Sequence, residues 1–192
     1  MADLATARLT VPEAAFLSGL TVTDVNREID ARIIGVRGSA ERKVRGADIF
    51  YLYAVREVRT QVDRSLRKDM RDAIAHAAEA HAHEARVHQF VFFLDEIRRE
   101  LTGPFEALER QHNEIETRKD VLGGEPVVKG TRIAARHVAD LIKRGATPAE
   151  ISADLDLTPA QIDAALTFDR TTPKRGRPPA RKSRTTHVPP AR

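Results

Sequence analysis

The stretch that decides the fold is residues 120–170, DVLGGEPVVKGTRIAARHVADLIKRGATPAEISADLDLTPAQIDAALTFDR. Within it, TPAEISADL at 147–155 and TPAQIDAAL at 158–166 repeat one design. Each begins with a threonine that suits the N-cap of a helix, followed by a proline in the first turn. Three residues after the threonine, Glu150 or Gln161 completes a capping box. The repeat therefore predicts two short helices that begin at Pro148 and Pro159.

A third helix precedes these two. RHVADLIKRG at 136–145 places its apolar residues on one face and ends in a glycine. Upstream, PVVKGTRI at 126–133 predicts a short, extended, hairpin-like element. Three glycines around it mark turns that need a positive φ: Gly123, Gly124 and Gly130. The stretch as a whole predicts a tight three-helix unit of helix-turn-helix type.

These motifs resemble the bacterial domain of unknown function 433, over about residues 113–170. The resemblance rests on GGEPVVKGTRI, the helix that ends in glycine, and the two TPA helices. That family pairs with PIN-type ribonuclease toxins and is often described as VapB-like, so the resemblance implies an antitoxin. The Tyr-Pro that usually precedes the last helix is replaced here by DLDLTPAQ. Lys129 and Arg132 contact DNA or the toxin, or Arg132 bonds the carbonyls of a structural turn; the residues leave these alternatives open.

The N-terminal segment ARLTVPEAAFLSGLTVTDVNREIDARII, residues 7–34, predicts a second pair of helices. Thr10 caps the first, which ends at Gly19, and Thr21 caps the second. An apolar stripe recurs every fourth residue along the second helix: Val25, Ile29 and Ile33. Two capped helices joined by a turn that contains glycine are typical of a helix-turn-helix.

The next segment, IIGVRGSAERKVRGADIF at 33–50, predicts two short strands around a polar turn, as in a wing. Residues 9–60 resemble the winged helix-turn-helix of the MerR and phage-excisionase families. That resemblance implies that Thr23, Asn26 and Arg27 face base edges. It also implies that the wing cations face phosphates: Arg37, Arg42, Lys43 and Arg45. The alternative is a helical pair that only packs on a partner.

Three acids on the predicted reading helix count against DNA binding. Asp24, Glu28 and Asp30 lie on the same helix as Asn26 and Arg27, and their charges would repel phosphate.

The middle of the chain predicts one long helix over residues 49–85, capped by Asp48. Its narrow apolar seam is typical of a helix that pairs with a second copy or with the following segment, and we expect a dimer contact there. The run Phe90–Phe93 predicts a buried strand or the start of a helix, and Gly103–Pro104 predicts a helix break.

The histidines of this region resemble a metal site without forming one. HAHEARVH at 81–88 nearly matches a zinc-protease motif, but His83 and His88 are five residues apart. On a helix that spacing separates them by about 140°, so they do not share one ion. We expect solvated histidines, no metal, no cofactor and no catalytic residues.

Charge is concentrated at the C-terminal end. The chain has 32 Lys and Arg against 28 Asp and Glu, and removing the seven cations of residues 171–192 leaves 25. The body is thus mildly acidic, and this final stretch supplies the positive balance. The chain has no Cys, which excludes disulfides and thiolate sites. Neither a signal-peptide pattern nor an apolar run of about 18 residues occurs, so we expect a cytoplasmic protein with no membrane contact.

The final stretch itself, TTPKRGRPPARKSRTTHVPPAR, contains no acidic residue and five of the ten prolines. Such a composition predicts a disordered arm that orders on binding. The family resemblance implies that arginine enters the carboxylate cluster by which a PIN-type toxin holds Mg²⁺. Guanidinium suits this role because it meets carboxylates in a bidentate manner. The expected toxin-binding residues are Lys174, Arg175, Arg177, Arg181 and Lys182, with Arg175 and Arg177 as the inserted pair.

The same arm supports two other interpretations. Arg-Gly-Arg-Pro at 175–178 is the core of an AT-hook, which places its arginines in a narrow A·T-rich minor groove. The arm could also serve only as a solvated tail.

Together these patterns predict a mainly α protein with two small helix-turn-helix modules, the first winged, joined by a helical linker. The expected divisions are 1–60, 61–112, 113–170 and the tail 171–192. We expect a non-enzymatic type II antitoxin that binds a PIN-type ribonuclease toxin and autorepresses at operator DNA. Its expected assembly is a homodimer or a larger toxin–antitoxin complex. The alternative is a stand-alone transcriptional regulator with an AT-hook-like tail.

Overall fold

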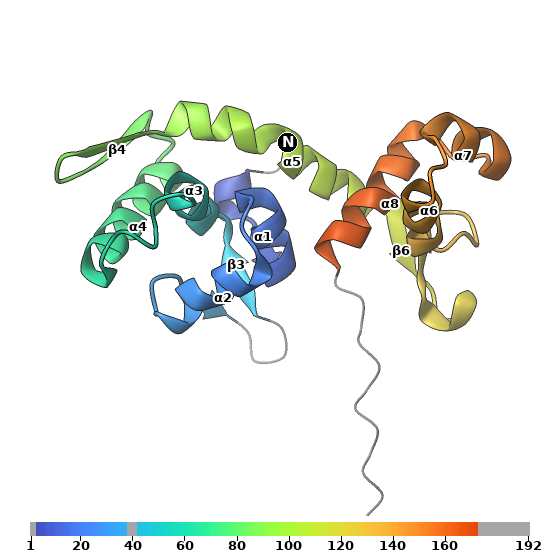
Figure 1. The fold of residues 1–192 in the computed structure, drawn as a ribbon, viewed down its shortest axis with the longest axis horizontal. Helices are drawn as coiled ribbons and strands as arrows, with labels where there is room; N and C mark the ends of the chain where they lie inside the picture. The colour runs from blue at the N-terminus through green and yellow to red at the C-terminus, as the bar shows by residue number, and fades with distance from the viewer. Residues whose placement is uncertain (1–2, 38–41, 173–192) are drawn as a thin grey trace, which may run out of the picture.

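The computed structural model describes residues 3–37 and 42–172 and confirms a mainly helical fold (Figure 1). Its helices are α1 (Val11–Ser18), α2 (Val22–Asp30), α3 (Gly46–Val55), α4 (Arg64–Glu79), α5 (Leu94–Glu114), α6 (Ala135–Lys143), α7 (Pro148–Leu155) and α8 (Pro159–Thr171). Two 3₁₀ turns are η1 (Leu4–Thr6) and η2 (Leu122–Gly124). The strands are β1 (Arg8–Thr10), β2 (Val36–Arg37), β3 (Lys43–Arg45), β4 (Glu84–Val87), β5 (Phe90–Phe93), β6 (Ile115–Thr117) and β7 (Pro126–Val128).

The N-terminal elements form the predicted winged helix-turn-helix. The Thr10 amide donates to the Glu13 carboxylate at 2.6 Å, and the Glu13 amide donates back to the Thr10 hydroxyl at 3.4 Å, so the capping box of α1 is closed. Gly19 ends α1 with φ of 72°, and Thr21 caps α2. Behind the two helices, β1, β3 and β2 form an antiparallel sheet in that order, with β2 and β3 as the hairpin.

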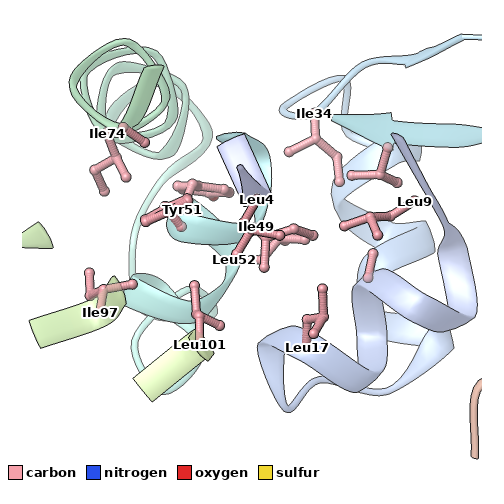
Figure 2. Close-up of a cluster of buried hydrophobic side chains, with 14 of the residues drawn as sticks. Leu4, Leu9, Leu17, Ile34, Ile49, Tyr51, Leu52, Ile74, Ile97 and Leu101 are labelled. Carbon is pink, nitrogen blue, oxygen red and sulfur yellow. The ribbon is translucent and has the colours of Figure 1, made fainter. Parts of the chain in front are cut away.

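Helix α3 lies at the centre of the larger hydrophobic core. Figure 2 shows its side chains Ile49 and Leu52 between Leu9 and Leu17 on one side and Ile97 on the other. Ile49 and Leu52 are fully buried. The wing module and the middle of the chain therefore share one core.

The prediction of one long helix over residues 49–85 is wrong. Helix α3 ends at Val55, turns follow, and α4 begins after Asp63. The Asp63 carboxylate accepts from the amides of Ser65 at 2.8 Å and Leu66 at 3.0 Å, which makes it an N-cap. Asp48, expected as a cap, instead lies buried in the first turn of α3. Four apolar residues of the expected seam, Ile49, Leu52, Val55 and Ile74, are buried within the chain, whereas Val58 of the same seam is 40% exposed.

Residues 84–93 form the hairpin β4–β5 and are not part of a helix. The strand expected at Phe90–Phe93 is present, but its burial is only partial. Alternate side chains of a strand face opposite sides. Accordingly Phe90 and Phe92 pack on the core, whereas Val91 is 41% and Phe93 57% exposed.

Helix α5 runs through Pro104 without the break expected at Gly103–Pro104. Buried residues lie on both sides of the proline, including Leu101 and Phe105. Their burial holds the helix straight enough to continue although Pro104 donates no backbone hydrogen bond.

The C-terminal elements form the predicted three-helix unit. Both capping boxes, Thr147 with Glu150 and Thr158 with Gln161, are closed. Ile151 and Ile162 are buried in a second hydrophobic core. The three glycines have the expected positive φ: Gly123 at 67°, Gly124 at 88° and Gly130 at 76°.

Helix α5 joins the two ends of the molecule. Figure 1 shows it crossing from the N-terminal elements to α6, α7 and α8. Helix α8 packs on α5 near its C-terminus, where the buried Thr171 hydroxyl donates to Gln111 at 2.7 Å. Helix α1 also contacts α5, through an ion pair between Glu13 and His112 at 2.8 Å. No helix in the described ranges is long and apolar enough to cross a bilayer.

Candidate nucleic-acid interface

Helix α2 presents one buried and one exposed face. Val25 and Glu28 are buried against the core, whereas Thr23 is exposed, Asn26 half-buried and the Arg27 side chain 72% exposed. Residues three and four apart share a helix face. The structure therefore brings together the three residues predicted to read bases, on the side of α2 that faces away from the core.

Asp24, predicted to repel phosphate, is instead neutralised by two arginines. Its carboxylate lies 2.5 Å from the guanidinium of Arg59 and 3.0 Å from that of Arg27. The hydroxyl of Thr21 donates to it at 2.7 Å. The Thr21 hydrogen bond, together with Arg59, holds the pKa of Asp24 below its usual range. Its charge is thus fixed and matched.

Glu28 points into the core and away from solvent. It is 1% exposed, accepts from the Tyr51 hydroxyl at 3.0 Å and pairs with Arg67 at 2.6 Å. Burial raises the pKa of Tyr51, with the neighbouring Glu28 charge adding to the effect, so the hydroxyl stays protonated and donates. Asp24 and Glu28, two of the three acids expected to repel phosphate, are therefore paired with arginines of the same chain. Asp30 alone of the three remains exposed on α2.

The wing is an antiparallel pair whose last register position before the tip joins two of the predicted residues. In the antiparallel register Arg37 lies opposite Lys43, and Val36 lies opposite Val44, which is fully buried. Arg42 is exposed beside them. The tip, residues 38–41, lies outside the described residues.

Arg45 differs from the other wing cations. Its guanidinium lies 3.3 Å from the fully buried carboxylate of Asp48 and 3.3 Å from Glu79. Arg71 meets the same Asp48 carboxylate at 2.8 Å. Because Arg45 joins this internal cluster, it faces the protein and not an approaching phosphate.

Arg59 and Arg67 are the residues that sequence reasoning missed. Both lie in the region expected to be one exposed helix, so neither was connected to α2. The available signal was Asp63, since an aspartate followed by helix-forming residues is a common N-cap. A helix restarted at Asp63 is what returns Arg67 to the Glu28 side of the core.

The C-terminal helix-turn-helix offers no comparable reading helix. Ile162 and Phe168 of α8 face the second core, while Thr171 meets Gln111 of α5. Helix α8 is therefore covered on two sides, and a major groove requires one free face along most of a helix.

The turn between β7 and α6 remains accessible. Lys129 and Arg132 are exposed, and no hydrogen bond or ion pair joins either side chain to another described residue. Thr131 holds the turn instead: its hydroxyl donates to the Val128 carbonyl at 2.8 Å and accepts from the Ile133 amide at 3.0 Å. The structural role considered for Arg132 thus belongs to Thr131.

The expected toxin-binding residues Lys174, Arg175, Arg177, Arg181 and Lys182 lie outside the described residues. The last described residue, Thr172, is held by Arg136. Arg136 donates to the Thr172 carbonyl at 3.0 Å and lies over the Phe168 ring at 5.5 Å.

His81 and His83 lie in the segment between α4 and β4, and His88 lies in the turn between β4 and β5, so their predicted helical setting is wrong. His83 pairs with Asp95 at 2.7 Å and His88 lies 3.7 Å from Asp69. Within the described ranges no group of three or more His, Asp or Glu side chains is placed to hold a metal ion.

Comparison with known proteins confirms the family resemblance of the C-terminal module. Residues 115–168 match the family described as "Protein of unknown function (DUF433)". No curated protein matches the chain. A crystal structure of Rv2018 from Mycobacterium tuberculosis is similar to this chain over 83% of its length and 100% of that chain, with 12% sequence identity and a TM-score of 0.32.

Proposed function

We propose that this protein is a non-catalytic antitoxin of a type II toxin–antitoxin system. In this proposal α2 and the β2–β3 wing bind operator DNA, and residues 173–192 bind and inhibit a PIN-type ribonuclease toxin. The observation that carries the DNA-binding part is the outward face of α2, from which two acids have been withdrawn into ion pairs.

The pairing of Asp24 favours a reading role for Arg27. Arg27 and Arg59 both meet the Asp24 carboxylate, and Arg59 is the more buried partner. Arg27 is therefore free to turn toward a guanine while Asp24 keeps a cation at 2.5 Å. Asn26 beside it suits adenine. The exposed Val22, in the first turn of α2, suits the methyl group of thymine.

The chemistry of the arm supports the toxin-binding part. Seven cations and no acid in 22 residues match the dense negative charge of a metal-binding carboxylate cluster. The resemblance of the sequence to an antitoxin family implies the same partner. The Arg136 bond to Thr172 gives the arm a fixed origin on the folded part.

The alternative, a regulator with two DNA-reading modules and an AT-hook, is weakened by α8. Because that helix is covered by both α5 and its own module, only the N-terminal module offers a reading helix. DNA contact by the arm stays compatible with toxin binding, since an autorepressing antitoxin binds both.

Charge reversal tests the assignment of the arm. The variant Arg175→Glu with Arg177→Glu should lose inhibition of the ribonuclease that co-purifies with the chain from its native host, as measured by RNA cleavage. Binding to the DNA upstream of its own gene should persist. A matched reversal on the folded surface, Lys129→Glu with Arg132→Glu, should retain inhibition. Loss of inhibition in this second variant alone would move the toxin contact to the β7–α6 turn, and loss of A·T-rich DNA binding alone in the first would favour the AT-hook.

A further inference from the structure

Exposed apolar side chains gather at one groove. Five large apolar side chains are exposed within the described residues: Val22, Val58, Val91, Phe93 and Leu122. Three of the five, Val58, Val91 and Phe93, line a single groove of about 1030 Å³ between the end of α3, strand β5 and α5. Scattered exposed apolar residues are normal, but a cluster in a groove is typical of an interaction surface. We call this the β5 groove.

The groove runs along the free edge of a strand. Sheet β4–β5 has two strands, so β5 is paired on one side only. Val91, Phe92 and Phe93 all line the groove, although consecutive strand side chains point to opposite faces. Both faces of β5 therefore contribute to the groove, and within the described residues the outer edge of β5 has no strand partner.

This edge lacks the usual protection against pairing. Native edge strands carry charges, prolines or bulges that prevent another strand from adding. The sequence of β5 is FVFF, with none of these features, and its pairing with β4 is regular across all four residues. An uncharged, regular edge is a template for a further strand.

The rim of the groove is self-complementary. Arg56 and Glu57 lie on the α3 side, at 3.7 Å from each other. Glu96, Arg99 and Glu100 lie on the α5 side. Arg99 likewise lies 4.0 Å from Glu96, and a copy related by a two-fold axis presents the same mixed set, so both carboxylates and guanidiniums are available to it. A cationic partner would gain from the acids but would meet the two arginines as well.

We propose that a second copy of this chain docks in the β5 groove, with the two β5 strands antiparallel in a four-stranded sheet. An antiparallel strand pair obeys two-fold symmetry, and FVFF brings no like charges together. Phe93 is the anchor, because it is the most exposed of the three apolar side chains. The chain's own residues 173–192 fit this edge less well, since five prolines interrupt their donors and seven cations approach Arg56 and Arg99.

Sedimentation velocity on the full chain, across a concentration series, tests the proposal without toxin or DNA. The unmodified chain and Leu122→Lys should sediment as dimers, whereas Phe93→Lys should have half that mass. Leu122 is the matched control because it is 55% exposed against 57% for Phe93 and lies outside the groove. A chain ending at Thr172 should remain dimeric. A monomeric unmodified chain, a dimeric Phe93→Lys, or a monomer produced only by removing residues 173–192 would each overturn the proposal.

A single cysteine gives an independent readout. The chain has no Cys, so any disulfide in Val91→Cys joins two chains. Mild oxidation should give a covalent dimer of Val91→Cys and not of Leu122→Cys. Equal crosslinking of both would mean random collision and would contradict the assigned surface. These tests do not depend on the proposed antitoxin function.

Discussion

At the scale of single residues, the character of the outward face of α2 depends on which side chains are paired inward. Asp24 and Glu28 are matched by arginines from distant parts of the chain, Arg59 and Arg67. The sequence of α2 alone predicts three repelling acids, because the pattern of one helix carries no information about partners more than 30 residues away. In contrast, the two partners of each capping box lie within four residues of each other along the chain, so the sequence alone predicts each box.

Asn26→Ala and Arg27→Ala should each weaken binding to the operator by about 1–3 kcal/mol, the cost of one lost base contact. Binding to scrambled DNA should change less, since that binding depends on phosphates. Fluorescence anisotropy with the DNA upstream of the chain's gene measures both. Arg86→Ala, a change of an equally exposed arginine on the β4–β5 hairpin, serves as the control. Equal affinity of all three variants for the operator would show that α2 is not the reading helix.

The Glu13–His112 pair should make stability depend on pH. The hydrogen bond between His112 and Glu13 raises the pKa of His112 above 6.5, because its effect is larger than the lowering of that pKa by burial. Burial pushes the pKa of Glu13 up, but hydrogen bonds from His112 and Thr10 outweigh it, and the net pKa lies below 4.5. The His112 contribution is therefore fully present below pH 6.5 and is lost as pH rises through its folded pKa. The Glu13 contribution is present above pH 4.5 and is lost as pH falls through its own folded pKa.

It follows that His112→Gln should lower the melting temperature most between pH 4.5 and pH 6.5. The loss should shrink in alkaline solution, where the unmodified His112 is neutral. Scanning calorimetry of both proteins in matched buffers measures the difference. A loss of the same size at acidic and alkaline pH would mean that only packing, and not charge, joins α1 to α5.

At the scale of elements, the sequence predicts helix starts well and helix continuity poorly. Thr10, Thr21, Thr147 and Thr158 all cap helices as predicted, because capping is a local hydrogen bond. The break at Asp63 and the unbroken path through Pro104 depend on tertiary packing. In the first case the Asp63 carboxylate caps the backbone amides that follow it, and this local interaction outweighs a weak apolar seam. In the second case the burial of Leu101 and Phe105 outweighs the helix-breaking tendency of Pro104.

Gly103→Ala tests the continuity of α5. Gly103 lies inside the helix, and a β-carbon there would meet nothing within 4 Å apart from its own chain neighbours, of which one is Pro104. Alanine should stabilise the protein by at most about 0.5–1 kcal/mol, because glycine loses more backbone entropy in a helix, while the alanine β-carbon crowds the ring of Pro104. Gly130→Ala should destabilise the protein, because Gly130 has a φ of 76°, which alanine adopts only with strain. The space around Gly130 is equally open, so crowding does not explain this loss. Urea unfolding measures both changes. Destabilisation by Gly103→Ala would indicate a real break at this position.

At the scale of the whole molecule, α5 places two different modules at opposite ends of one continuous helix (Figure 1). The N-terminal module carries the accessible helix α2, and the C-terminal module carries the fixed origin of the basic arm. The N-terminal module and the family of the C-terminal module could be predicted from motifs. The shared core of α1, α3 and α4 could not, because its contacts join residues far apart in the sequence. The free edge of β5 was also missed, since the predicted helix concealed the hairpin.

A truncation that removes the basic arm must leave the folded body intact. The cut belongs after Thr172, because the Thr171 hydroxyl bonds Gln111 inside the α5–α8 contact. A cut before Thr171 would remove part of the folded body together with the arm. Circular dichroism on the chain ending at Thr172 should give the helix content of residues 3–172 unchanged.

Growth rescue by the chain ending at Thr172, with operator affinity measured on the same protein, tests the central claim most directly. We expect this chain to bind the DNA upstream of its gene as the full chain does, and to fail to rescue cells that express the co-purifying ribonuclease. Full rescue by the truncated chain would contradict the account, because inhibition would then reside in the folded body and not in the basic arm.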